Sequence, residues 1–329
     1  MLSTGVEIPR VEVREETGRD TRRFLRYVAP KPETVRRVPK LLRSTLVIAP
    51  MGFGKTSFVE AKLGEAVQYL LDVHGVDDDR IAYVYAQEVP LQVVLDAVAD
   101  LPLQDYWYLY IFMDDVIAAE GMHGRRAMSQ ENVEQTKALV MVRHRLENLG
   151  FTGYTHIVWT AQVYTLVDIS VRRTSVLKIF KDYPDEPSDL RVIGRMLGSA
   201  ALQALDEISA MVTSDEPGQI LRGLYTGVAL MKRRKWLIRA YTRPEDIEEE
   251  VARRKAVLAR VKRLHVGPQA AAEHATLKQQ LGAALYLVKR LLPHIEIRPW
   301  NNQKYKLIVK NATLYVKRDM LEQLGLTPS

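Results

Sequence analysis

The chain has 329 residues, of which 47% are hydrophobic and 26% charged, and this ordinary globular composition excludes wholesale disorder. It contains no Cys, which excludes disulfide bridges, thiolate zinc sites, iron–sulfur clusters and a cysteine nucleophile. Lys and Arg number 47 against 40 Asp and Glu, and the net charge of +7 favours a polyanionic partner. Apolar runs stay shorter than the ~18 residues of a membrane span, and residues 1–10 lack a signal-peptide core, so we expect a cytoplasmic protein without a membrane span.

The length exceeds that of a usual single core, and composition changes along the chain divide it into four regions. We expect an N-terminal charged arm at 1–43 and an α/β core at 44–189. A basic, mostly helical region follows at 190–265, and a small module at 266–329 ends the chain.

Short apolar runs alternate with helical patterns through the first half of the chain. The runs predict strands at 44–49, 81–85, 106–113, 155–160 and 176–180, and the patterns predict helices at 56–74, 91–99 and 129–148. Because the strands are apolar almost throughout, both faces of their sheet must be covered, which is typical of parallel sheets. The expected fold class is therefore α/β, with a doubly wound and mainly parallel sheet.

The second half reads as helical until close to its end. Helical patterns cover 190–212, 220–237, 242–264 and 270–292, with Gly267 and Pro268 as a break. Strands are expected at 295–298, 305–309 and 313–317, and the last two can pair as a hairpin. A helix followed by a hairpin at the end of a basic chain is compatible with a winged-helix-like module.

The sharpest motif runs from Ala49 to Thr56 and matches the phosphate-loop pattern G-x-x-x-x-G-K-[ST], with Ala at the first position. A predicted strand precedes it and a predicted helix follows, which is the context that a phosphate loop requires. Glycines let the backbone turn its N–H groups around a phosphate, and Lys55 can reach the β- and γ-phosphates of a nucleotide. The expected nucleotide-binding residues are Pro50, Met51, Gly52, Phe53, Gly54, Lys55, Thr56 and Ser57.

Acidic and polar residues follow the later strands of the predicted core. The apolar run from Tyr108 ends in Asp114, a carboxylate that can hold Mg²⁺ together with the Thr56 hydroxyl. Gln162 follows the strand at 155–160, and Glu88 follows the strand at 81–85.

With these motifs, residues 44–182 resemble a P-loop ATPase of the additional-strand class, of the FtsK–HerA kind, which includes viral genome-packaging and plasmid-mobilisation ATPases. The resemblance implies a ring that hydrolyses ATP and drives double-stranded DNA through its pore. In that class a Glu often follows the metal-binding Asp and polarises the attacking water; here the residue is Asp115, so Glu88 competes for the role. The resemblance also implies that Gln162, or alternatively Thr160, senses the γ-phosphate.

Two arginine pairs can supply charge to a transition state. Arg172 and Arg173 lie between the fourth and fifth predicted strands, where proteins of this kind often carry an arginine that acts on a neighbouring subunit. Arg125 and Arg126 are alternatives, either for this role or for DNA contacts. A surface basic pair without function is the competing interpretation of both pairs.

Residues 222–263 carry 13 Lys and Arg against five acids. Within this region Lys232, Arg233, Arg234 and Lys235 adjoin Trp236, and we interpret these four as candidate contacts to nucleic-acid phosphates. A solvated helix face is the alternative.

Three functions remain open from the sequence. The first is a ring-forming motor that couples Mg²⁺-dependent ATP hydrolysis to translocation or remodelling of DNA, in packaging, plasmid transfer or segregation. The second is a replication initiator or helicase loader of the AAA+ type, with a helical lid and a C-terminal winged helix. The third is a slow nucleotide-dependent regulatory switch, which the shorter acid Asp115 would favour.

Overall fold

The computed structural model describes residues 18–115, 141–241, 244–270 and 272–273, together with strands at 295–301, 304–309 and 312–317. The chain divides into two compact units, Met1–Pro268 and Gln269–Ser329.

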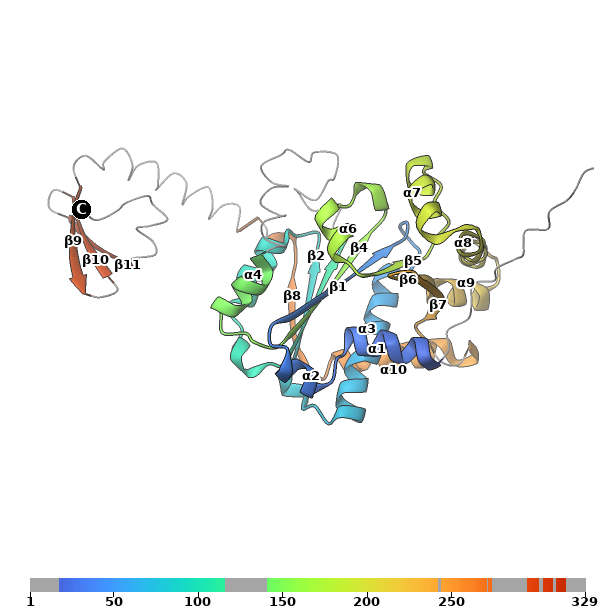
Figure 1. Cartoon of the computed structure of the whole chain (residues 1–329), viewed down its shortest axis with the longest axis horizontal. Coiled ribbons are helices and arrows are strands. Elements are labelled where there is room, and N and C mark those ends of the chain that lie inside the picture. Colours follow the sequence, from blue (N-terminus) through green and yellow to red (C-terminus); the bar gives the residue numbers. More distant parts are fainter. Residues whose placement is uncertain are drawn as a thin grey trace, which may run out of the picture. The chain divides into compact units, whose positions relative to one another are not determined.

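The first unit alternates strands and helices in chain order (Figure 1). Its strands are β1 (Leu41–Ile48), β2 (Ile81–Gln87), β3 (Tyr108–Asp114), β4 (Tyr154–Ala161), β5 (Leu177–Phe180), β6 (Thr226–Met231), β7 (Arg234–Arg239) and β8 (Lys262–Val266). Its helices include α1 (Gly18–Val28), α2 (Pro32–Arg37), α3 (Lys55–His74), α4 (Leu91–Val98), α6 (Ile169–Thr174), α7 (Pro187–Leu197), α8 (Ser199–Val212), α9 (Pro217–Leu224) and α10 (Ile247–Leu258). The five strands and the first two helices expected of the core are confirmed, with ends shifted by up to three residues.

These strands form one eight-stranded sheet in the order β7-β6-β5-β1-β4-β3-β2-β8. The pairs from β5 to β8 in this order are parallel, whereas β6 pairs antiparallel with both β5 and β7. The expected α/β class with a mainly parallel sheet is confirmed. Strand β4 lies between β1 and β3 and pairs parallel with both.

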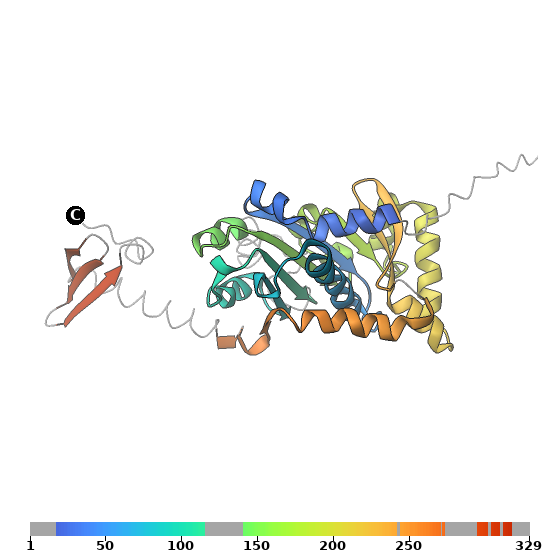
Figure 2. The same cartoon turned by 90° about the horizontal axis from the view of Figure 1, so that it is seen from below.

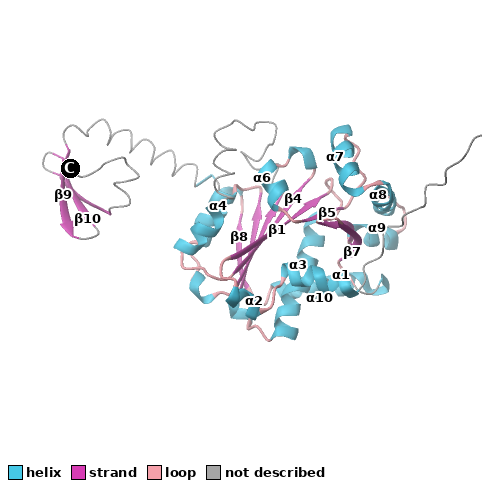
Figure 3. Ribbon diagram, viewed as in Figure 1, coloured by secondary structure: helices cyan, strands magenta, loops and turns pink. Residues whose placement is uncertain are grey.

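Helices enclose the sheet (Figure 3). Every residue of β3 and β4 is buried. On one face α1, α3 and α10 share a hydrophobic cluster with Tyr110, Phe112 and Val158 of the sheet. Figures 1 and 2 show α3 beside α10, and α1 also contacts α3. The α3 helix, which begins at the phosphate loop, is therefore held between the sheet and two further helices.

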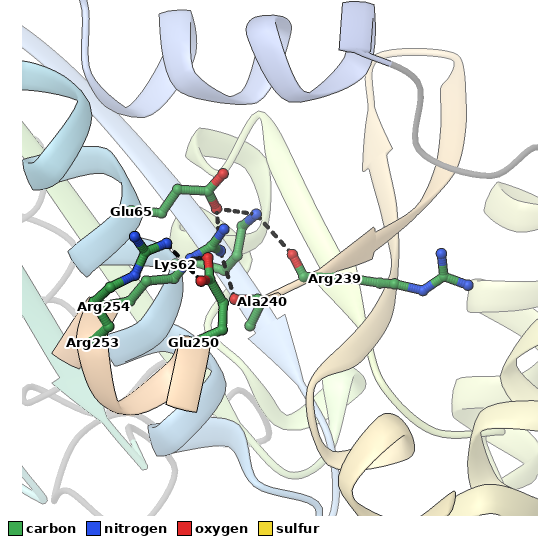
Figure 4. A network of polar contacts seen from close by, with 7 residues as sticks. All are labelled: Lys62, Glu65, Arg239, Ala240, Glu250, Arg253 and Arg254. Atoms are coloured by element: carbon green, nitrogen blue, oxygen red, sulfur yellow. Dashed lines mark hydrogen bonds and ion pairs between the residues drawn. The ribbon is translucent and has the colours of Figure 1, made fainter. Parts of the chain in front are cut away.

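A network of polar contacts ties α3 to α10 and to the end of β7 (Figure 4). Arg254 of α10 is only 4% exposed and donates to Glu65 of α3 at 2.9 Å and to Glu250 at 2.9 Å. Lys62 of α3 donates to the backbone oxygen of Arg239 at 2.9 Å. Guanidinium and ammonium groups are costly to bury without partners, so these bonds fix how α3 and α10 cross.

One of the expected helices is wrong, and another ends earlier than expected. The stretch at 220–237 holds the end of α9 and the β6–β7 hairpin, whose turn lies at Lys232 and Arg233. The helix expected to reach 264 ends at Leu258, and β8 follows it. A short apolar run such as 227–231 fits a buried strand as well as a helix. For this reason its pattern was interpreted as part of a helix.

These strands place residues 226–266 in the same sheet as the core, so the region that we expected as a separate helical one contributes three strands to it. The helical stretch at 190–212 is confirmed, as α7 and α8 joined at Gly198. The described part of the expected N-terminal arm also packs on the core. There, Phe24 and Val28 of α1 are buried, and the hydroxyl of Tyr110 in β3 donates to the Val28 oxygen at 3.1 Å.

The second unit contains an antiparallel sheet in the order β11-β10-β9, made of β9 (Ile295–Asn301), β10 (Lys304–Val309) and β11 (Ala312–Lys317). Its β10–β11 pairing confirms the expected hairpin, with Val309 opposite Ala312. The helix expected at 270–292, on which a winged-helix-like module depends, lies outside the described residues except at its first few positions. Within the described parts of the chain, no helix combines the length and the apolar character needed to cross a membrane.

Candidate nucleotide-binding site

The phosphate loop connects β1 to α3 through Ala49–Gly54. Gly52 and Gly54 have φ of 83° and 66°, a left-handed conformation that side chains disfavour, so glycine is required at these turns. Gly54 precedes the first residue of α3, and no side chain caps this helix start. The backbone N–H groups of the first turn are therefore available to an anion. Met51, at the apex of the loop, is 78% exposed.

Lys55 is buried and folds back over the loop. Its Nζ donates to the backbone oxygens of Ala49 at 2.9 Å and Pro50 at 3.0 Å. Burial lowers the pKa of Lys55, while the carboxylates of Asp115 and Asp114 act in the opposite direction. The charge of Lys55 is thus held inside the loop where the sequence predicted a phosphate contact.

Asp114 at the end of β3 lies directly beside the phosphate loop. Its Oδ2 accepts a hydrogen bond from the Thr56 hydroxyl at 2.8 Å, and its Oδ1 accepts one from the Thr160 hydroxyl of β4 at 2.6 Å. A carboxylate and a hydroxyl on adjoining elements are the hard oxygen ligands that Mg²⁺ takes from proteins in sites where phosphates complete its shell. Thr56 and Asp114 are therefore placed to hold Mg²⁺.

Asp115 occupies a strained position at the same edge of the sheet. Its φ is 50°, which is uncommon for a non-glycine residue, and its backbone N–H donates to the Thr160 hydroxyl at 2.8 Å. Gln162 after β4 donates from Nε2 to Asp115 Oδ2 at 3.0 Å. The other oxygen, Oδ1, is buried and has no hydrogen-bond partner among the residues that the structure describes. Such an orphaned acceptor fits a site that a water or ligand completes.

Glu88, the competing acid, lies after β2 and is exposed. Its backbone N–H donates to the Asp114 oxygen at 3.1 Å, and its φ is 52°. The structure thus brings both acids to one edge, but it bonds only the side chain of Asp115 to Gln162.

The two arginines of α6 differ in their surroundings. Arg172 is half-buried, with its guanidinium carbon 5.4 Å from the centre of the Tyr164 ring. Arg173 is exposed at the end of the helix. Ile169 of the same helix and Val176 just after it are exposed hydrophobic side chains. Arg125 and Arg126 lie outside the described residues.

The four basic residues at 232–235 lie on the β6–β7 hairpin and not on a helix. Lys232 and Arg233 form its turn, with Lys232 at a φ of 58°, and both are exposed, as is Arg234. Lys235 is partly buried and donates to the backbone oxygen of Leu197. Three of the four candidate contacts are thus free to meet a polyanion.

Sequence reasoning missed two residues near the site. The Tyr85 hydroxyl on β2 donates to Asp114 Oδ2 at 2.9 Å, so a third hydroxyl orients this carboxylate. Lys181, directly after β5, is fully buried close to Lys55. The predicted strand ends were a signal for both, because β2 and β5 end at the same edge of the sheet as the phosphate loop.

No protein-family model and no curated protein matches this sequence. Among solved structures, the genome-packaging NTPase B204 of Sulfolobus turreted icosahedral virus 2, in complex with ATPγS, is 12% identical with a TM-score of 0.37, over 59% of this chain and 95% of that one. ATPases 2 and 3 of EssC from Geobacillus thermodenitrificans are 10% identical with a TM-score of 0.37, over 68% of this chain and 46% of that one. The N-terminal domain of zonular occludens toxin from Neisseria meningitidis is 14% identical with a TM-score of 0.27, over 43% of this chain and 76% of that one.

Similarity at this level leaves the function to be derived from the chain's own residues. The mainly parallel sheet and the glycine-containing loop between β1 and α3 are the arrangement that the phosphate-loop motif predicts.

Proposed function

We propose that this protein is a Mg²⁺-dependent ATPase whose hydrolysis cycle drives movement or remodelling of double-stranded DNA. The observation that carries the ATPase part is the hydrogen-bonded series from Thr56 through Asp114 and Thr160 at the mouth of the phosphate loop. These hydrogen bonds join the phosphate loop, the end of β3 and the end of β4 at one point, and Asp115 and Gln162 lie beside them.

Each residue of the site has a separate part in this chemistry. The loop N–H groups and Lys55 bind the phosphates, and Thr56 with Asp114 would hold Mg²⁺, which neutralises charge that develops on the phosphate oxygens. Asp115 is the residue that we assign to orient the attacking water. Gln162 fixes one Asp115 oxygen and leaves the other, orphaned one for that water.

The test of the ATPase is the variant Lys55→Ala. Removal of the ammonium should lower ATP turnover by about a hundredfold or more, because the phosphate charge loses its partner in a buried site. The matched control is Lys31→Ala, an exposed lysine near His74 at the opposite end of α3, which should keep wild-type turnover. Normal turnover in Lys55→Ala would show that hydrolysis takes place elsewhere.

The DNA part rests on the exposed turn of the β6–β7 hairpin. Its cations Lys232, Arg233 and Arg234 would contact phosphates without reading sequence, and such contacts release counterions. Replacement of all three by Ser should reduce the slope of log affinity against log salt by about 2 to 3, measured by fluorescence anisotropy with a duplex. An unchanged slope would remove the hairpin from the DNA contact.

A slow switch is the second candidate, and the observation that favours it is the short side chain of Asp115 where a longer acid is usual. This alternative predicts turnover below about one per minute that duplex DNA does not change, against the roughly 1–10³ s⁻¹ of typical enzymes. The initiator or loader alternative depends on a helical lid after the core. Here α8 instead packs on β6, a strand of the main sheet.

A further inference from the structure

Lys181 is a buried cation beside the phosphate loop that the proposed reaction does not use. It follows β5, the strand next to β1, and its backbone N–H donates to the Ile48 oxygen at the end of β1 at 3.0 Å. Its side chain is fully buried, and Nζ lies 4.4 Å from the centre of the Phe58 ring in α3. A lysine is rarely buried in this way unless its ammonium has a specific task.

The ammonium of Lys181 bonds the junction between α9 and β6. Its Nζ donates to the backbone oxygens of Leu224 at 2.8 Å and Thr226 at 2.9 Å. Both partners are neutral carbonyls, so these bonds only partly repay the desolvation of the charge. The charged state of Lys181 therefore depends on other charges that come close to it.

The same junction touches the phosphate loop. A Cβ built on Gly54 would lie 3.1 Å from the Leu224 oxygen, so the loop and the junction are in direct contact at the start of α3. The Tyr225 side chain is hydrogen-bonded to that of Ser57 in the first turn of α3. Lys181 thus holds a segment that closes the back of the loop.

We propose that Lys181 is a positioning residue that couples charge in the phosphate loop to the α9–β6 junction and clamps the junction on the loop when a nucleotide is bound. This inference rests on the proposed nucleotide binding. It extends that function by naming a residue outside both sequence motifs.

The charges around Lys181 determine how its protonation responds to nucleotide binding. Burial and, to a smaller extent, the positive charge of Lys55 together lower the pKa of Lys181 to about 7. The neighbouring titratable groups are Asp182, which accepts a hydrogen bond from Ser209, and the phenol of Tyr225, and burial raises the pKa of both. Phosphates that neutralise Lys55 remove its repulsion and add negative charge, so the pKa of Lys181 rises and the ammonium form is retained.

The bonds of Lys181 are connected to the basic β6–β7 hairpin through the backbone of β6. Thr226 is the first residue of β6, and β6 leads to the turn at Lys232. At the other end of the hairpin, Lys62 of α3 donates to the Arg239 oxygen. The two ends of the β6–β7 hairpin are therefore bonded to Lys181 beside the phosphate loop and to Lys62 of α3.

The experiment is titration calorimetry of the full chain with Mg²⁺ and ATPγS at pH 6 and pH 8, each in two buffers of different ionisation enthalpy. With its pKa near 7, Lys181 is about nine-tenths protonated at pH 6 and about one-tenth at pH 8 before binding. Wild type should therefore take up about half a proton or more at pH 8 beyond its uptake at pH 6. Lys181→Met should lose this difference and bind ATPγS about tenfold more weakly at pH 6.

The matched control is Lys178→Met on the same strand. Burial also lowers the pKa of Lys178, but its Nζ donates to the Ser175 oxygen and not to the α9–β6 junction. Proton uptake by Lys178→Met on nucleotide binding should therefore stay as in wild type. If Lys181→Met does not fold, Lys181→Arg replaces it, because a guanidinium stays charged and uptake should vanish as well. Equal uptake in wild type and the Lys181 variant, or none in wild type at pH 8, would overturn the inference. Failure of wild type to bind ATPγS at all would instead overturn the proposed function.

Discussion

Asp115 combines three features at one residue: a left-handed backbone, one carboxylate oxygen held by Gln162, and a second, buried oxygen that has no partner in the described part of the chain. Strain of this kind persists only where the surroundings enforce it, and the bond from its N–H to Thr160 does so. The side chain is therefore fixed in one orientation before any substrate arrives, which is the condition for orienting a water molecule efficiently.

The first prediction compares the two acids of this edge. Asp115→Asn should lower kcat about 10²–10³-fold, because the amide cannot accept a proton, while nucleotide affinity changes little. Glu88→Gln is the matched variant, and as an exposed side chain it should stay within about threefold of wild type. Steady-state ATPase assays and nucleotide titrations measure both. A larger loss of kcat in Glu88→Gln would transfer the role of base to Glu88.

The second prediction concerns a buried histidine below the site. His156 of β4 hydrogen-bonds Thr45 at 3.1 Å and Tyr154 at 2.8 Å, and burial, with Arg43, lowers its pKa to about 3 from an ordinary 6.5. Between these values the unfolded chain binds a proton that the folded chain does not, so stability is present above pH 6.5 and is lost as the pH falls toward 3.

His156→Gln should therefore flatten the fall of unfolding free energy below pH 6.5 by up to about 1.4 kcal/mol per pH unit, measured by urea denaturation. The exposed His144 supplies the control, since His144→Gln should keep the wild-type slope. An identical slope in His156→Gln and wild type would contradict a neutral, buried imidazole.

Residues inside the contiguous motif could be named from the sequence, whereas their helpers could not. Lys55, Thr56 and Asp114 follow from spacing alone, because the loop and the strand end have a fixed chemistry. Tyr85 and Lys181 belong to no motif, and their importance arises from which strands become neighbours in the sheet. A single sequence does not state that order.

At the scale of elements, α3 and α10 form the tightest helix pair of the described core. A Cβ built on Gly64 would lie 1.9 Å from the Arg254 backbone oxygen, so only glycine permits this crossing. The buried Arg254 then bridges Glu65 and Glu250 across it. Backbone contact and ion pairing thus fix the same interface by independent means.

The third prediction tests the buried ion pairs through two adjacent arginines. Arg254→Met should destabilise the fold by about 3 kcal/mol, because two partly buried carboxylates lose the same guanidinium. Arg253 also pairs with Glu250 but is 59% exposed, so Arg253→Met should cost less than about 1 kcal/mol. Urea denaturation separates the two, and equal losses would contradict a special role for the buried residue.

The fourth prediction tests the close crossing by adding one methyl group. Gly64→Ala should destabilise the fold by about 2 kcal/mol or more, because the backbone of α10 must move away. Gly194 in α7 is the matched helix glycine, where the added Cβ would meet only Leu202 Cδ1 at 3.4 Å. Gly194→Ala should be neutral or stabilising by up to about 1 kcal/mol, since alanine is the better helix former. Thermal melting of both variants measures these two changes in stability.

Elements of the core could be predicted well because each strand is a mostly apolar run between clear turn signals. The β6–β7 hairpin was missed because Gly227–Met231 is apolar throughout, and such a run fits a helix as well as a strand. In β7, the buried Trp236 and Ile238 alternate with less buried neighbours, as expected of a strand. β8 was missed because Lys262 and Arg263 resemble the end of a charged helix. As the edge strand of the sheet, β8 can carry such charges, and they protect the edge from pairing.

At the scale of the whole molecule, the phosphate loop, Asp114, Asp115 and Gln162 lie together at one edge of the sheet, whereas the exposed Arg173 lies on α6. Arg173 is exposed beside the hydrophobic side chains of Ile169 and Val176, whereas Arg172 is held against Tyr164. If the chain assembles into a ring, we expect this exposed part of α6 to lie at the contact with the next copy. In a ring such a contact is head-to-tail, so each copy can supply Arg173 to the loop of the next.

The last prediction tests this arrangement by mixing two inactive proteins. Arg173→Ala should lower kcat about 10³-fold, because the transition state loses a charge partner, and Lys55→Ala is inactive through its own loop. In mixed rings an intact loop meets an intact arginine at about a quarter of the sites, so an equimolar mixture should regain about a quarter of wild-type turnover. Lys55→Ala mixed with Asp115→Asn is the control and should regain nothing, because each lesion disables the site of its own subunit. Activity of the first mixture no higher than the sum of its components would mean that Arg173 does not act between subunits, and α6 would then be an ordinary basic surface of an ATPase that completes its site alone.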